Sequence, residues 1–326
     1  MPESRPNLHN PFNIFYLTTA GILYLLVIIT NGLIVVVNLA DWTKVRSLMP
    51  KDEIVTSLGL SNICFSTAIT LDYFTSLIWK EFYRHFYCMQ IVMFSLDIAT
   101  SFSSFWFMAW LTVFYCMKIV DFKQPFLLKV KLRFSGLIRW LLLGSVLVSV
   151  GATLLVTWAV RTASHVKLHM ELTNQTDDLS SDFNLTLNIK KDKITLVHMA
   201  LSYRLLLIIL GCSAPLVVVI FSSIPVLKSL FTHAQNLGQN LSLFHNPRLE
   251  VHLNAAKAVL SLLLSYCSSY ICEILIRAEL FPNWTYQYFL CLTAMLVTIV
   301  VQGSVLILSN PKLKQSAAQV LPFLSQ

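Results

Sequence analysis

Four ionisable side chains lie within long apolar stretches of the sequence: Asp72, Asp97, Arg204 and Glu273. Charged groups are costly inside a membrane, and where they occur there they usually belong to a functional site. Counted along the predicted helices at about 1.5 Å per residue, all four lie roughly 10–15 Å from the same side of the bundle. We therefore expect a binding site for a small ligand at this level.

Asp97 is the acid with the most polar surroundings. Ser101 and Ser104 follow it at i+4 and i+7, so the three side chains share one helix face, which should turn inward. One interpretation is that Asp97 is the counter-ion of a cationic ligand, with cation–π contacts from Tyr270 and Trp106. The candidate ligand-binding residues are Asp97, Ser101, Ser104, Asp72, Arg204, Glu273, Tyr270 and Trp106.

A second interpretation treats the same charges as structural ion pairs. In that arrangement Arg204 pairs with Asp97, and Glu273 pairs with Arg277 one helical turn further on. Both interpretations remain open at the level of the sequence.

The elements that carry these residues are membrane-spanning helices. The chain is 56% apolar and 12% charged, whereas soluble domains carry roughly 25% charged residues. The apolar stretches are long and continuous, which indicates helices and not a barrel of alternating strands. We predict an all-α membrane protein, a single seven-helix bundle over residues 1–326, with helices at about 15–39, 54–79, 88–115, 137–160, 194–224, 258–280 and 286–308.

The orientation follows from the distribution of positive charge. Lys and Arg concentrate in the loops that are cytoplasmic if the N-terminus is extracellular, so the C-terminal tail, residues 312–326, should be cytoplasmic. The long loop 161–193 is then extracellular. Its two Asn-x-Thr sequons, at Asn174 and Asn184, are expected to carry glycans.

The sequence offers no sign of catalysis. We find no zinc-type Cys/His spacing, no phosphate-binding glycine loop and no Ser/His/Asp arrangement. We therefore expect no enzyme activity, no cofactor, no metal and no nucleic-acid partner. The oligomeric state is open.

Three motifs resemble those of a known family. They are Asn31-Gly32 in the first helix, the run Phe114-Tyr115-Cys116-Met117-Lys118-Ile119-Val120-Asp121-Phe122 after the third, and Asn310-Pro311-Lys312-Leu313-Lys314 after the last. Together they resemble the bitter taste receptors, the type 2 taste receptor family, over residues 31–314. Type 1 vomeronasal receptors are an alternative within receptors, but the Lys118–Phe122 run and the final Lys-Leu-Lys favour the bitter family. A transporter or channel would need charges along the full depth of the bilayer.

The resemblance implies a G-protein-coupled receptor in the plasma membrane. Its ligands would be small hydrophobic or cationic bitter compounds, and its partner a heterotrimeric G protein of the gustducin or inhibitory class. The basic residues that would serve coupling are Lys118, Arg133, His233, His252 and Lys257. These charges would equally set the topology and meet anionic lipid.

The chain departs from the family at two positions in the helices. Asn62 stands where the family usually has Arg, and Gln302 stands where it usually has His. We therefore expect a neutral hydrogen-bonded pair of Asn31 and Asn62 as the structural polar core.

Overall fold

The computed structural model describes residues 11–78, 87–120, 124–176, 211–229, 247–278 and 285–324, with positions 202, 209, 280 and 281. This part of the chain is helical and contains no strand. Within it, seven helices are long and apolar enough to cross a membrane, as predicted. The labelled helices are α1 Pro11–Val45, α2 Pro50–Ile78, α4 Tyr87–Ile119, α5 Pro125–Thr176, α7 Pro247–Arg277, α8 Tyr286–Ser309 and α9 Pro311–Leu324; the fifth span, Gly211–Ser229, carries no label.

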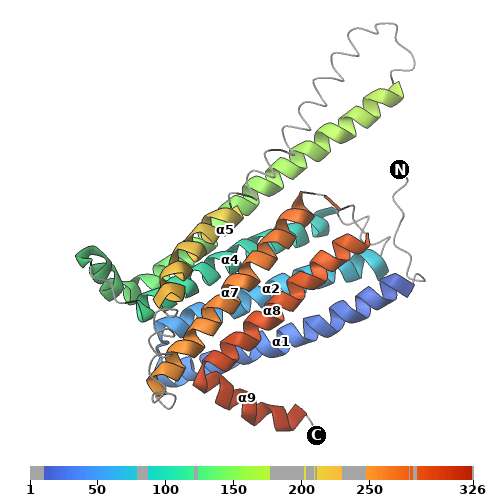
Figure 1. The fold of residues 1–326 in the computed structure, drawn as a ribbon. Helices are drawn as coiled ribbons and strands as arrows, with labels where there is room; N and C mark the ends of the chain where they lie inside the picture. Colours follow the sequence, from blue (N-terminus) through green and yellow to red (C-terminus); the bar gives the residue numbers. More distant parts are fainter. Residues whose placement is uncertain are drawn as a thin grey trace.

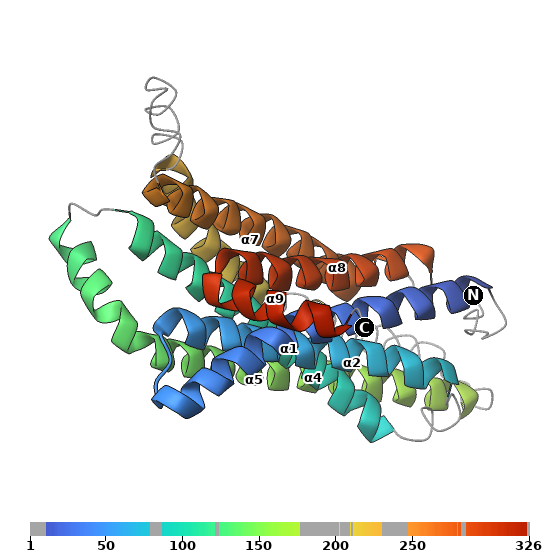
Figure 2. The same cartoon turned by 90° about the horizontal axis from the view of Figure 1, so that it is seen from below.

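The helices run side by side along one axis, and α9 turns away from the end of α8 (Figure 1). Figure 2 shows α7 beside α8 from below. The end of the bundle at which α1 begins is called the outer end, in line with the predicted orientation. The end at which α9 begins is called the inner end.

Proline marks where many of these helices begin. Pro11, Pro50, Pro125, Pro247 and Pro311 are the first residues of α1, α2, α5, α7 and α9. Proline suits the first helical position, because its missing N–H would have no partner there and its φ angle is already helical. Thus the local sequence fixes these boundaries, while the apolar runs predict only the membrane-embedded parts.

The junction between α8 and α9 depends on one asparagine. Asn310 is the C-cap of α8, and its side-chain Oδ1 accepts a hydrogen bond from the Lys312 backbone N–H at 3.3 Å. Asn310 therefore ends one helix and caps the next, which explains why the Asn310-Pro311-Lys312 segment bends the chain.

The helix α5 is much longer than predicted. It has 52 residues, about 78 Å at 1.5 Å per residue, and only Arg133–Trp158 is apolar enough to span. Two exposed tryptophans, Trp140 and Trp158, lie about 27 Å apart on one face, close to the thickness of the hydrocarbon core of a bilayer. Beyond Trp158 the helix leaves the bundle (Figure 1). The predicted loop 161–193 therefore begins as helix up to Thr176, and Asn174 lies in its last turn; Asn184 lies outside the described residues.

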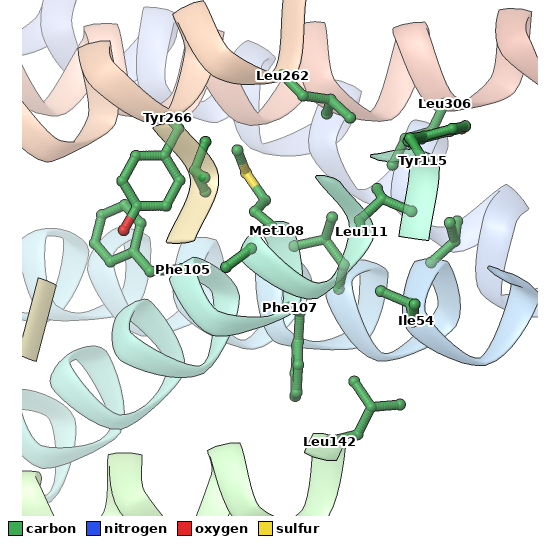
Figure 3. Close-up of a cluster of buried hydrophobic side chains, with 14 of the residues drawn as sticks. Ile54, Phe105, Phe107, Met108, Leu111, Tyr115, Leu142, Leu262, Tyr266 and Leu306 are labelled. Atoms are coloured by element: carbon green, nitrogen blue, oxygen red, sulfur yellow. The ribbon is translucent and has the colours of Figure 1, made fainter. Parts of the chain in front are cut away.

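The largest apolar core surrounds α4. Phe105, Met108 and Leu111 of this helix pack against side chains of α2, α5, α7 and α8 (Figure 3). Elsewhere glycine brings helices together: a Cβ on Gly303 of α8 would lie 2.9 Å from Thr30 Oγ1 of α1. Small residues permit such close packing of membrane helices.

Candidate functional site

An ion-paired cluster joins α4 to α7 in the outer half of the bundle. Arg277 Nη2 donates to Asp97 Oδ2 at 2.5 Å, and Arg277 Nε donates to Glu273 Oε1 at 3.0 Å. The Arg277, Asp97 and Glu273 side chains are 10%, 17% and 2% exposed, respectively. Ser101 Oγ also donates to Glu273 Oε1, at 3.3 Å. We call Asp97, Glu273, Arg277 and Ser101 the outer cluster.

The charges of the outer cluster do not balance. One guanidinium is shared by two carboxylates, and Asp97 Oδ1 is buried without a hydrogen bond. Asp72, the other predicted acid, is partly buried on α2 and has interactions of its own. Among the described residues, the site thus carries excess negative charge, and a buried carboxylate oxygen without a donor is unfavourable. The arrangement can accept a cation or a hydrogen-bond donor.

The predicted ion pairs are partly present. Glu273 does pair with Arg277, as the second interpretation expected. Asp97, however, uses the same Arg277, whereas its expected partner Arg204 lies outside the described residues. Both interpretations of Asp97 therefore retain support: it is an ion-pair partner, and it has an unused oxygen.

The two predicted aromatic contributors lie in different surroundings. Tyr270 is half-buried against the large apolar core, one turn before Glu273 on α7. Trp106 stacks on Trp110 with ring centroids 5.8 Å apart, and the Trp110 indole N–H donates to Ser145 of α5. Nine residues separate Trp106 from Asp97, which is half a turn around the helix. Trp106 therefore faces away from Asp97 and is not placed to give the expected cation–π contact to a ligand there; a ring that does lie near the cluster is Phe94, 5.5 Å from the Arg277 guanidinium.

A second polar group lies deeper in the bundle, which we call the central network. Asn62 Nδ2 donates to Asn31 Oδ1 at 3.2 Å and to Gln302 Oε1 at 3.4 Å. Ser104 Oγ lies 3.2 Å from Asn62 Oδ1 and 2.9 Å from Ser61 Oγ. The neutral pair of Asn31 and Asn62 is thus present. It extends to Gln302, the other position at which the chain departs from the family pattern.

A cavity separates the outer cluster from the central network. It has a volume of about 30 Å³ and is lined by Asn62, Phe65, Ser101, Ser104, Phe105, Met108, Ser269, Met295, Ile299 and Gln302. Ser101 and Ser104 both line it, so the predicted inward face of this helix is correct for the two serines. Asp97 is not among the lining residues.

The inner end carries the predicted coupling residues. Lys118, Arg133 and Lys257 are exposed there, and His252 lies in the first turns of α7. His233 lies outside the described residues.

A lysine that the sequence did not single out anchors α9 at the inner end. Lys312 Nζ lies 2.5 Å from Asp41 Oδ2, 4.0 Å from Asp52 Oδ2 and 3.0 Å from Asn38 Oδ1. This contact connects α9 to the last turns of α1 and the first turn of α2. These acids and the position of Lys312 in the Lys-Leu-Lys motif were visible in the sequence, but their contact depends on how α9 folds back.

Comparison with known sequences gives one family. The family model described as "Taste receptor protein (TAS2R)" matches residues 9–325. Taste receptor type 2 member 40 of Gallus gallus is 29% identical over 298 residues, covering 90% of each chain. Taste receptor type 2 member 41 of Rattus norvegicus is 28% identical over 317 residues, covering 95% of this chain and 96% of its own. Among solved structures, squid rhodopsin superposes with a TM-score of 0.53 at 16% identity over 96% of this chain and 87% of its own, which supports the fold.

Proposed function

Since this chain belongs to the taste receptor type 2 family of bitter taste receptors, we propose that it recognises cationic bitter compounds at the outer cluster and activates an inhibitory-class, gustducin-like G protein. The family and the seven spans make it a multi-pass receptor of the plasma membrane, and not an enzyme. The ligand charge, the location of the site, the N-out orientation and the class of G protein are the proposed parts.

The observation that carries the proposal is the single guanidinium shared by Asp97 and Glu273. It leaves Asp97 Oδ1 buried without a hydrogen bond. A protonated amine would supply the missing donor and neutralise the excess charge, whereas a quaternary ammonium, which has no N–H, would neutralise the charge alone. Because water is largely excluded there, a charge-assisted hydrogen bond is stronger than it would be at the surface.

The apolar wall beside the cluster suits the rest of such a ligand. Phe94 lies against Arg277, and Tyr270 follows one turn below Glu273 on the same helix. Aromatic faces next to a carboxylate attract amines and quaternary ammonium groups by cation–π interaction, worth about 0.5–2 kcal/mol. An uncharged hydrophobic compound would gain from the rings alone.

The inner end supports the G-protein part of the proposal. Lys118, Arg133 and Lys257 project into solvent from α4, α5 and α7, which gives this end exposed positive charge. An acidic segment of a G protein would find complementary charge there, and electrostatic complementarity mainly raises the rate of association.

The test is a calcium-release assay with a chimeric G protein. A panel of alkaloid amines and quaternary ammonium compounds, each with an uncharged analogue, is applied to the native receptor and to Asp97→Asn. We expect the half-maximal concentration of the cationic agonists to rise about tenfold, equivalent to about 1.4 kcal/mol, while that of neutral agonists changes little.

The matched control is Asp41→Asn, which removes the same charge at the other end of the bundle. Any effect of that variant should be equal for charged and uncharged compounds. Equal losses for both kinds of compound in Asp97→Asn would show that Asp97 is a structural ion-pair partner only. Ion flux without calcium release across the whole panel would contradict the receptor function itself.

A further inference from the structure

The cavity between the outer cluster and the central network has polar walls at both ends. Ser101 on its outer side donates to Glu273 at 3.3 Å. Ser104, Asn62 and Gln302 on its inner side belong to the central network. The outer cluster and the central network therefore both border the same small cavity.

The Gln302 amide on this wall uses its oxygen but not its N–H groups among the described residues. Its Oε1 accepts from Asn62, but its two N–H groups make no hydrogen bond within the described part of the chain. The residue is 4% exposed. A buried amide with unused donors is unfavourable unless water or a ligand accepts from it, because its interaction with bulk water has been lost.

The volume of the cavity limits what can bind in it. A water molecule needs roughly 10–15 Å³ measured in this way, so about 30 Å³ holds about two. Ligand sites for organic compounds are an order of magnitude larger, roughly 300–1,000 Å³. The volume therefore suits water better than a whole bitter compound.

The charge of the residues that line the cavity decides whether water or a metal cation suits it better. The polar residues that line the cavity are Asn62, Ser101, Ser104, Ser269 and Gln302, all neutral. The carboxylate that Ser101 contacts, Glu273, already accepts from Arg277 and Ser101. A monovalent cation would sit in a weakly polar space without an anionic ligand, which is unfavourable.

We propose that the cavity binds about two ordered water molecules, which accept from the Gln302 amide and bridge Ser101 to Ser104. These waters complete a hydrogen-bonded chain from Arg277 and Glu273, through Ser101, to Asn62 and Asn31. The chain spans α7, α4, α2 and α1. This hydration site does not depend on the charge of the bitter ligand, so its test is separate from that of the proposed function.

Pulsed X-ray radiolysis of the purified, agonist-free receptor in nanodiscs tests the proposal. Hydroxyl radicals formed from bound water modify the side chains next to it, and mass spectrometry measures the rate at each residue. Phe105 lines the cavity and is 5% exposed, whereas Phe102 and Phe289 are 1% and 2% exposed and do not line it. We expect Phe105 to be modified several times faster than the other two.

A cavity-filling variant tests the same point at Met108 and Met295, which line the cavity and are 2% and 3% exposed. Their modification rates are compared with those in the native receptor. Ser269→Val places two methyl groups toward this space, and Thr298 keeps its hydrogen bond to the Met295 carbonyl. Displacing about two waters should lower the modification of both methionines about fivefold. Ser269→Ala, which removes the hydroxyl without filling the space, should leave the rates near the native values.

Three results would overturn the hydration site. One is protection of Phe105 equal to that of Phe289 in the native receptor. Another is an unchanged rate at Met108 in Ser269→Val. A third is a rise in thermal stability when choline chloride is replaced by sodium chloride at equal ionic strength, which would indicate a bound cation in place of water.

Discussion

Arg277 Nη2 lies 2.5 Å from Asp97 Oδ2, and this contact joins the last turn of α7 to the outer third of α4. The same guanidinium donates to Glu273 at 3.0 Å, so one cation holds two acids. Removing it leaves two carboxylates facing each other in a site from which water is largely excluded. The position of Arg277 therefore matters for stability whether or not a ligand binds there.

Arg277→Gln should destabilise the receptor by about 3–5 kcal/mol, because it leaves buried charges without a partner. We expect a clear fall in the melting temperature of the purified protein and in surface expression. Adding Glu273→Gln should recover part of the loss, because one of the two opposed charges disappears.

Arg139→Gln is the control for this ion pair. Arg139 pairs with Glu53 at 2.8 Å, but its side chain is 70% exposed. Exposed pairs contribute about 0–1 kcal/mol, so this variant should melt near the native temperature. If Arg277→Gln and Arg139→Gln lower the melting temperature equally, the outer cluster is not a buried ion-paired site.

Gly303→Ala should also be destabilising, although alanine favours helix. The new Cβ would lie 2.9 Å from Thr30 Oγ1 and 3.2 Å from Asn31 Nδ2, so α8 and α1 would have to separate. Overpacking of this kind costs about 1–3 kcal/mol. Thermal unfolding measures it, and Gly144→Ala, where a Cβ meets nothing within 4 Å, should be neutral or slightly stabilising.

Asn31 and Asn62 should show coupled effects on stability. Asn62→Ala removes the donor to Asn31 and Gln302 and leaves buried acceptors unsatisfied, at about 1–3 kcal/mol. Asn31→Ala should cost a similar amount, and the double variant should cost less than the sum. Strict additivity in the thermal unfolding of the three variants would mean that the 3.2 Å contact contributes nothing.

The sequence predicts the membrane-embedded part of the fold well, because about 20 apolar residues are needed to cross lipid and little else produces such runs. The helix ends are harder to predict. Beyond Trp158 the chain is polar, yet α5 continues to Thr176, since hydrogen bonding within a helix needs no lipid. Apolar length therefore gives the span but says nothing of helix outside it.

In the site, positions on one helix could be predicted from the sequence, but contacts between helices could not. Ser101 and Ser104 could be placed by helical periodicity alone, because both lie on one face of one helix. The Arg277–Asp97 contact could not, since it depends on how α4 and α7 are rotated and offset relative to each other. Trp106 was misplaced for a simpler reason: its position nine residues after Asp97 turns it to the face of α4 that meets α5.

The inner end gives a final prediction, on the orientation of α9. Lys312 reaches Asn38, Asp41 and Asp52 from the first turn of α9, whereas Lys314 is exposed two residues further on. Lys312→Glu places a negative charge among these acids and should release α9 from the inner ends of α1 and α2. The paired change Lys312→Glu with Asp41→Lys restores opposite charges and should restore its position.

Spin labels on Gln319 and Thr43, both exposed, measure the distance between α9 and the end of α1. We expect a narrow distribution in the native receptor, a broad one in Lys312→Glu and a narrow one again in the charge-reversed pair. Lys314→Glu makes the same charge change without the acidic partners and should leave the distribution narrow. If it broadens the distribution as much as Lys312→Glu does, the net charge of α9 holds the helix in place, and the contact with Asp41 does not.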